Sequence, residues 1–130
     1  MRAIKLVSVV LSLIVGSYGM ASAQMSSTPS NVKIANGMIT DSKGMTLYTF
    51  DKDTAPGKSA CNGQCATIWP LLPVASDAMA MGPWTIITRD DGKKQWAYKG
   101  KPLYTFAQDS KAGDMAGDGK GGGAWHMAKP

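Results

Sequence analysis

The stretch that decides the fold is Gly44–Trp69, GMTLYTFDKDTAPGKSACNGQCATIW, and it returns at Gly100–Trp125 as GKPLYTFAQDSKAGDMAGDGKGGGAW. The two segments align without a gap at an offset of 56 residues and share ten identical positions. Both contain the run Leu-Tyr-Thr-Phe, an aspartate three residues after it and a closing tryptophan. Two copies of one supersecondary unit cannot each bury a hydrophobic face alone, so we expect them to share one core.

Short runs of β-branched and aromatic residues, separated by turn residues such as Asn36-Gly37 and Asp91-Gly92, occur in and before each copy. They predict strands at 32–35, 38–41 and 46–50 for the first copy, and at 84–88, 95–98, 103–106 and 125–128 for the second. We therefore expect an all-β domain of two duplicated β-meander repeats. Two related meanders can cover each other in a barrel- or sandwich-like arrangement with pseudo-two-fold symmetry.

Helices are expected to be nearly absent. The segment 61–69 allows one short helix in the first copy, whereas its glycine-rich counterpart 117–123 is expected to be a loop. The chain has 15 Gly and 7 Pro among 130 residues, and all nine of its acidic residues are Asp, a poor helix former. This composition argues against a helix bundle.

The charged residues also exclude some functions. The formal net charge is +5, but the lysines are scattered and form no basic stripe, so we expect no binding to nucleic acid. One His and no Glu leave few general acid–base groups, which argues against an enzyme.

The first residues predict export. Arg2 and Lys5 precede the apolar run 6–15, and Ala21-Ser22-Ala23 follows it, which is the pattern of a signal peptide at 1–23 cleaved before Gln24. No cysteine stands at this cleavage point, so no lipid anchor is expected there and no direct membrane anchor is expected after cleavage. The predicted location is the periplasm or the medium.

The remaining chain reads as a disordered start at 24–31 and a single β domain at 32–130. Within that domain we place the first repeat at about 32–71 and the second at about 84–128. The stretch 72–83, rich in Pro, Ala and Met, is expected to link them.

The shared aromatic and acidic residues have two interpretations. The period of two in a strand places Tyr48 and Phe50 on one face, and likewise Tyr104 and Phe106. In the architectural interpretation these rings are buried and each aspartate caps the loop that follows. In the alternative they line an aromatic ligand groove that occurs twice. The residues concerned are Tyr48, Phe50, Asp53 and Trp69 in the first copy, and Tyr104, Phe106, Asp109 and Trp125 in the second.

Cys61 and Cys65 are the only cysteines. Two cysteines in an exported protein usually pair, and a separation of four residues permits the Cα spacing of a disulfide. The alternative is a dithiol site for a metal or for redox chemistry.

Soft ligands give a second functional alternative. Met79, Met81, His126 and Met127 are the candidate metal ligands, since thioethers favour Cu(I). Methionine also fills gaps in small cores, and His126 alone suits a hydrogen-bonded ring at a strand end. We expect no cofactor apart from this copper alternative.

The chain resembles the secreted-repeat family of predicted bacterial lipoproteins with a Y-x-[FWY]-x-x-D motif. The motif occurs at 48–53 and again at 104–109, and the stretches 57–70, 87–104 and 125–126 also resemble the family. The resemblance implies an extracytoplasmic β-rich module. We expect a non-catalytic module that binds an envelope partner or a small ligand, with a periplasmic copper or redox-metal carrier as the alternative.

Overall fold

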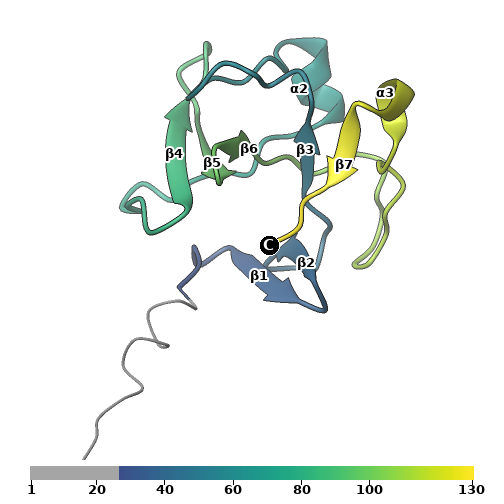
Figure 1. Ribbon diagram of the computed structural model, residues 1–130, viewed down its shortest axis with the longest axis horizontal. Coiled ribbons are helices and arrows are strands. Elements are labelled where there is room, and N and C mark those ends of the chain that lie inside the picture. Colours follow the sequence, from purple (N-terminus) through teal and green to yellow (C-terminus); the bar gives the residue numbers. More distant parts are fainter. Residues whose placement is uncertain (1–26) are drawn as a thin grey trace, which may run out of the picture.

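The computed structural model describes residues 27–130, and the expected signal peptide lies outside them (Figure 1). Of the expected disordered start, residues 24–26 also lie outside. Residues 27–31 are described. The Asn31 side-chain amide donates a hydrogen bond of 2.9 Å to the Pro73 carbonyl, so this part is tied to the domain.

The fold is mostly β and built from short elements. In chain order they are β1 (Val32–Ala35), β2 (Met38–Asp41), β3 (Tyr48–Phe50), α2 (Gln64–Ile68), β4 (Trp84–Thr88), β5 (Lys94–Tyr98), β6 (Lys101–Pro102), α3 (Lys120–Gly123) and β7 (Trp125–Met127). All strand pairs are antiparallel, and they form three sheets, β1–β2, β3–β7 and β4–β5–β6 (Figure 1). The predicted duplicated, mostly β fold is confirmed.

The expected closure into a barrel is wrong for the described residues, whose sheets are small and separate. Their strands are only two to five residues long, because Gly, Pro and Asp residues interrupt them. Isolated bridges such as Tyr48–Tyr104 and Thr40–Thr46 replace continuous ladders between the sheets. The expected strand 103–106 is reduced to such a bridge.

The two repeats are intertwined. Strand β3 of the first repeat pairs with β7 of the second, so that Phe50 lies opposite Trp125. The reciprocal pairing also occurs: the Thr105 N–H donates to the Pro70 carbonyl at 2.8 Å and the Ala107 N–H to the Ile68 carbonyl at 2.9 Å. Each Leu-Tyr-Thr-Phe run therefore pairs with the segment around the tryptophan of the other repeat.

The centre of this exchange is the pair Tyr48 and Tyr104. Their backbones exchange two hydrogen bonds, of 2.7 and 3.0 Å. Contacts that recur with the repeats interchanged are what a pseudo-two-fold relation requires, and this pair lies where the axis would pass.

The helices differ in part from expectation. Helix α2 lies within the predicted segment, but a second helical turn, α3, forms where a loop was predicted. Gly121 and Gly122 in α3 have φ of 68° and 73°. Glycine adopts this left-handed conformation at little cost because it lacks a Cβ, so a run of glycines can close a turn that other residues could not.

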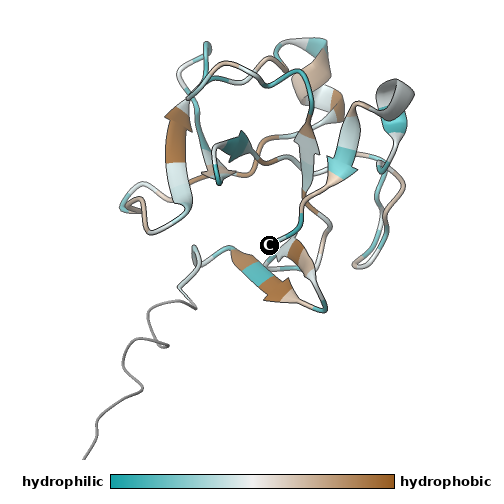
Figure 2. Cartoon of the chain, viewed as in Figure 1, coloured by the Kyte–Doolittle hydropathy of each residue, from teal (hydrophilic) through white to brown (hydrophobic). Residues whose placement is uncertain are grey.

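The core consists of two clusters on opposite sides of the Leu-Tyr-Thr-Phe runs. Leu47 and Leu103 belong to the first cluster, whereas Tyr48 and Tyr104 belong to the second, as the period of two in a strand requires. The strongest hydrophobic colouring in Figure 2 lies on β1, β2 and the second half of β4; these strands contribute Val32, Ile39 and the partly buried Ile86 to the first cluster.

The start of the expected linker is part of this core. Leu72 is 1% exposed, and its N–H donates a hydrogen bond of 2.9 Å to the Leu103 carbonyl.

Across residues 27–130 there is no helix with the length and apolar character needed to cross a bilayer.

Candidate functional site

Four aromatic rings form a continuous stack at the interface between the repeats. The indoles of Trp69 and Trp125 lie 3.7 Å apart between centroids, with an interplanar angle of 2°. Phe106 stacks on Trp69 at 4.3 Å, and Phe50 stacks on Trp125 at 4.1 Å. The order Phe50, Trp125, Trp69, Phe106 alternates between the repeats, which follows directly from their exchanged strand pairing.

The aspartates of the motif are exchanged in the same way. The Tyr48 hydroxyl donates to Asp109 at 2.6 Å, and the Tyr104 hydroxyl donates to Asp53 at 2.6 Å. The second carboxylate oxygen of each aspartate accepts a backbone N–H seven residues further on, from Ala60 or Ala116. Each aspartate thus holds its own loop and the tyrosine of the other repeat.

Burial decides between the two interpretations of these rings. Tyr48, Tyr104, Trp69, Trp125 and Phe106 are buried, with Phe106 4% exposed and Trp69 6% exposed. Phe50, at one end of the stack, is half-buried. Rings packed in this way belong to the core, and they present no open aromatic groove to a ligand.

The environment of both tyrosines disfavours ionisation. Burial and the hydrogen-bonded carboxylates raise the pKa of Tyr48 and Tyr104 well above the ordinary value of about 10. Burial likewise raises the pKa of Asp53 above its usual range, against the opposing effect of the Tyr104 hydroxyl.

These shifts predict a loss of stability at alkaline pH. In the unfolded chain both phenols ionise from about pH 10, whereas in the folded chain they keep their protons, so stability is complete below about pH 10 and falls as pH rises above it. The slope per tyrosine approaches about 1.4 kcal/mol per pH unit. Urea unfolding between neutral and alkaline pH measures it. Lysines also titrate in this pH range, and Tyr48→Phe removes one phenol while leaving every lysine in place. This variant should show a smaller decrease of unfolding free energy per pH unit. An unchanged decrease would show that the Tyr48 phenol is not responsible for it.

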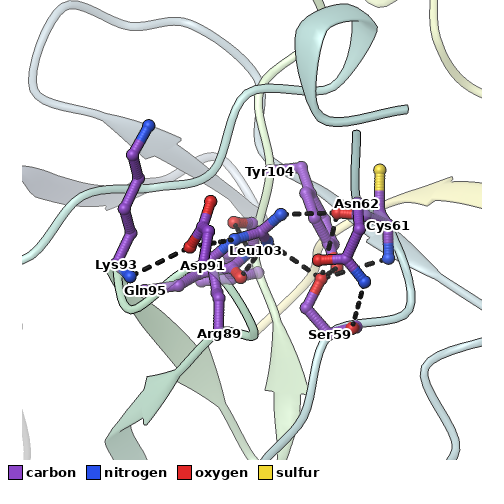
Figure 3. Close-up of polar contacts among 9 residues, drawn as sticks. All are labelled: Ser59, Cys61, Asn62, Arg89, Asp91, Lys93, Gln95, Leu103 and Tyr104. Atoms are coloured by element: carbon purple, nitrogen blue, oxygen red, sulfur yellow. Dashed lines mark hydrogen bonds and ion pairs between the residues drawn. The ribbon is translucent and has the colours of Figure 1, made fainter. Parts of the chain in front are cut away.

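A buried polar network joins the loop around Cys61 in the first repeat to the start of the second repeat (Figure 3). The Arg89 guanidinium donates to Ser59 Oγ at 2.9 Å, to Gln95 Oε1 at 2.7 Å and to the Cys61 carbonyl. Ser59 Oγ is also 2.7 Å from the Tyr104 hydroxyl, which links the network to the exchanged Tyr–Asp pair.

Arg89 is 3% exposed and follows β4 directly. Its Nε has no hydrogen-bond partner and lies 3.9 Å from the Asp91 carboxylate. Gln95 is fully buried on β5, and its side-chain amide donates a hydrogen bond of 2.7 Å to the Leu103 carbonyl. The network therefore extends from Arg89 through Gln95 to Leu103. The guanidinium therefore connects residues 59–65, here called the cysteine loop, to the β4–β5 hairpin.

Residues 115–117 of the second repeat, which correspond to residues 59–61 of the first, do not form these contacts. The position equivalent to Ser59 is Met115, and the Tyr48 hydroxyl instead accepts the Gly117 N–H at 3.2 Å. A Cβ on Gly117 would lie 2.7 Å from the Trp69 ring, so glycine is required where the first repeat has Cys61.

In the first repeat the Ser59 hydroxyl lies between the Arg89 guanidinium and the Tyr104 phenol, with no free base beside it. The network is suited to clamping rather than to nucleophilic chemistry.

Cys61 and Cys65 form a disulfide, with their Sγ atoms 2.00 Å apart and their Cα atoms 5.2 Å apart. Arg89 donates a hydrogen bond to the backbone carbonyl of Cys61. The Cys61 side chain belongs to the second core cluster, and Cys65 packs against that cluster.

Removing the disulfide should have a moderate effect. Closing a loop of about five residues contributes about 2 kcal/mol in the chain-entropy model, so the double variant Cys61→Ser/Cys65→Ser should lose about that much unfolding free energy. Urea denaturation measures the loss. Alkylation of the exported protein without reductant should label neither cysteine, and two labelled thiols would contradict the pairing.

The candidate metal ligands lie in two places. Met79 and Met81 line a cavity of about 370 Å³, whereas His126 and Met127 line another of about 300 Å³, and the two share no lining residue. His126 Nε2 lies 2.9 Å from Asp51. In the part of the chain that the structure describes, no three His, Cys, Asp or Glu side chains are grouped to hold a metal. Copper binding stays a prediction.

An open apolar groove of about 690 Å³ lies beside the first core cluster. One wall comes from the segment between the repeats, and the other from β4 and the turn that follows it. The lining residues are Leu71, Pro73, Val74, Ala75, Ser76, Ala78, Ile86, Lys93 and Lys94. The groove was not predicted, because the composition of the segment 72–83 is that of a spacer.

Arg89, Ser59 and Gln95 were also not predicted as a connected set. Arg89 and Gln95 both lie in the stretch 87–104 that resembles the secreted-repeat family, and this resemblance was the available signal.

Comparisons with curated proteins and with solved structures gave no match. A family model described as a secreted repeat of unknown function matches residues 31–72 and again 85–129. The chain thus belongs to this family of secreted repeats, and it carries two of them.

Proposed function

We propose that the protein is a secreted, non-catalytic binding module whose ligand is a small amphiphilic anion. The observation that carries this proposal is the groove of about 690 Å³, whose lining is largely apolar and includes two lysines. Its volume falls within the range of about 300–1,000 Å³ that is usual for small-ligand sites.

The floor of the groove is suited to an apolar chain or ring. Val74, Ala78 and Ile86 are partly buried and pack against the first core cluster, so the groove is backed by the rigid part of the domain. An apolar ligand body here would remove both its own surface and theirs from water, which is favourable by about 25 cal/mol per Å².

The two lysines in the lining favour an anionic ligand. Lys93 and Lys94 are both exposed, and the Lys94 ammonium makes a 3.1 Å hydrogen bond to the neutral Thr88 hydroxyl rather than to a carboxylate. Two cations beside an apolar surface complement a molecule with a hydrocarbon body and a carboxylate head.

Binding of dodecanoate tests the proposal, measured by calorimetric titration below its micellar concentration. We expect saturable binding of dodecanoate, much weaker binding of dodecanol, and a loss of affinity of at least about tenfold in Lys93→Gln/Lys94→Gln, equivalent to about 1.4 kcal/mol. Val74→Arg should block the groove.

The matched control is Lys52→Gln/Lys58→Gln, which removes the same charge from a different surface cleft. This variant should bind dodecanoate as the wild type does. Equal binding of dodecanoate and dodecanol, or an unchanged affinity in both groove variants, would contradict the proposal.

A further inference from the structure

A second concave surface lies beside the β3–β7 sheet, away from the amphiphile groove. It has a volume of about 300 Å³ and shares no lining residue with that groove. Thr49 and His126, paired in register on β3 and β7, form part of its lining. The other lining residues include Asp51 after β3, Lys99 in the β5–β6 turn, Lys101 on β6 and Lys129 near the end of the chain.

The charges around this cavity are unbalanced. Three lysines and a single acidic residue, Asp51, line the cavity, and the Asp51 carboxylate lies 2.9 Å from His126 Nε2. Within residues 27–130, none of the three lysines lies within ion-pair distance of an acidic group. The lysines thus concentrate positive charge that the domain itself does not neutralise.

Lys99 lies in the turn between β5 and β6, and its side chain contacts the Tyr98 ring. Lys99 has φ of 51°, a left-handed conformation that is uncommon for residues other than Gly, Asn and Asp. Its N–H is fixed by a 2.8 Å hydrogen bond to the Pro83 carbonyl, and its ammonium lies 5.2 Å from the centroid of the Tyr98 ring, which also lines the cavity.

From this arrangement we infer that the cavity binds a phosphate-type oxyanion. The lysine ammonium groups would supply charge and hydrogen-bond donors, and the Thr49 hydroxyl would supply a further donor. The shared chemistry is that of a phosphate group, whether free or in the headgroup of an anionic lipid. This site is independent of the amphiphile groove, so either proposal can fail without the other.

Amide and side-chain NMR of the full exported chain, titrated with inorganic phosphate at constant ionic strength, tests the inference. The largest shifts should fall on Thr49, Lys99 and His126, with saturation in the millimolar range and weaker binding as NaCl is raised. Lys101→Gln/Lys129→Gln should weaken phosphate binding at least about tenfold. The matched control, Lys33→Gln/Lys43→Gln, removes two exposed lysines that do not line the cavity and should bind as the wild type does.

A second arm identifies the source of the phosphate group. Flotation with phosphatidylglycerol vesicles, compared with phosphatidylcholine vesicles, reports headgroup binding. Phosphate binding that depends on Lys101 and Lys129 supports a free oxyanion, and binding to the anionic vesicles alone with the same dependence supports a headgroup. Neither binding, or equal losses in the two double-lysine variants, would overturn the inference.

Discussion

Replacement of Trp125 by alanine is expected to lower the unfolding free energy by about 3–5 kcal/mol, the usual cost of truncating a buried aromatic residue to alanine. Trp125 is one of the two central rings of the stack, is 4% exposed, and contacts Trp69, Phe50 and Tyr104. Domains of this size are stable by about 5–15 kcal/mol, so the variant should be largely destabilised or unfolded at room temperature. Urea denaturation followed by tryptophan fluorescence and circular dichroism measures the change.

The ends of the stack provide the comparison. Phe106→Ala should cost nearly as much as Trp125→Ala because Phe106 is 4% exposed. Phe50→Ala should cost clearly less, because Phe50 is only half-buried and part of its surface already faces water. A Trp125→Ala variant as stable as the wild type would show that the stack does not hold the repeats together.

Arg89→Met is expected to lower the unfolding free energy by about 3 kcal/mol. Methionine fills much of the space of the arginine side chain but donates no hydrogen bonds, so Gln95 Oε1 and the Cys61 carbonyl lose their partner. Each buried polar group left without a partner costs about 1–3 kcal/mol. The loss should appear in the urea midpoint and as faster amide exchange in the cysteine loop.

Two further variants make this result specific. Asp91→Asn should cost no more than about 1 kcal/mol, because Asp91 is half-exposed and lies 3.9 Å from the guanidinium. Arg89→Lys keeps the charge but cannot reach three acceptors from one planar group, so it should recover only part of the loss. If Arg89→Met is as stable as the wild type, the guanidinium is not a clamp.

Much of the fold could be predicted because local patterns determine it. The alternation in Leu-Tyr-Thr-Phe separated the side of the strand that carries Leu47 from the side that carries Tyr48, and the structure sends them to different core clusters. The turn dipeptides located the β1–β2 and β4–β5 hairpins. Glycine patterns were less informative, since a glycine run is compatible with a loop or with the left-handed turn found in α3.

The exchange between repeats could not be predicted from the alignment. Identical residues at a fixed offset give the same pattern whether Tyr48 meets Asp53 in its own repeat or Asp109 in the other. Only the long-range pairing of β3 with β7 distinguishes these arrangements. The Arg89 network was hidden for a related reason: a charged residue just after a strand usually faces water, and its burial depends on acceptors brought from distant segments.

Each tyrosine of the repeated motif is bonded to the aspartate of the other repeat, and this exchange is what intertwines the two halves of the domain. Double-mutant cycles with Tyr→Phe and Asp→Asn, read by urea denaturation, test it most directly. Hydrogen bonds to charged groups contribute about 1.5–3 kcal/mol, and contacting residues show coupling energies of about 0.5–3 kcal/mol. We predict coupling in this range for Tyr48 with Asp109 and for Tyr104 with Asp53, and much smaller coupling for Tyr48 with Asp53 and for Tyr104 with Asp109. Strong coupling within each repeat and none between repeats would contradict the intertwined arrangement.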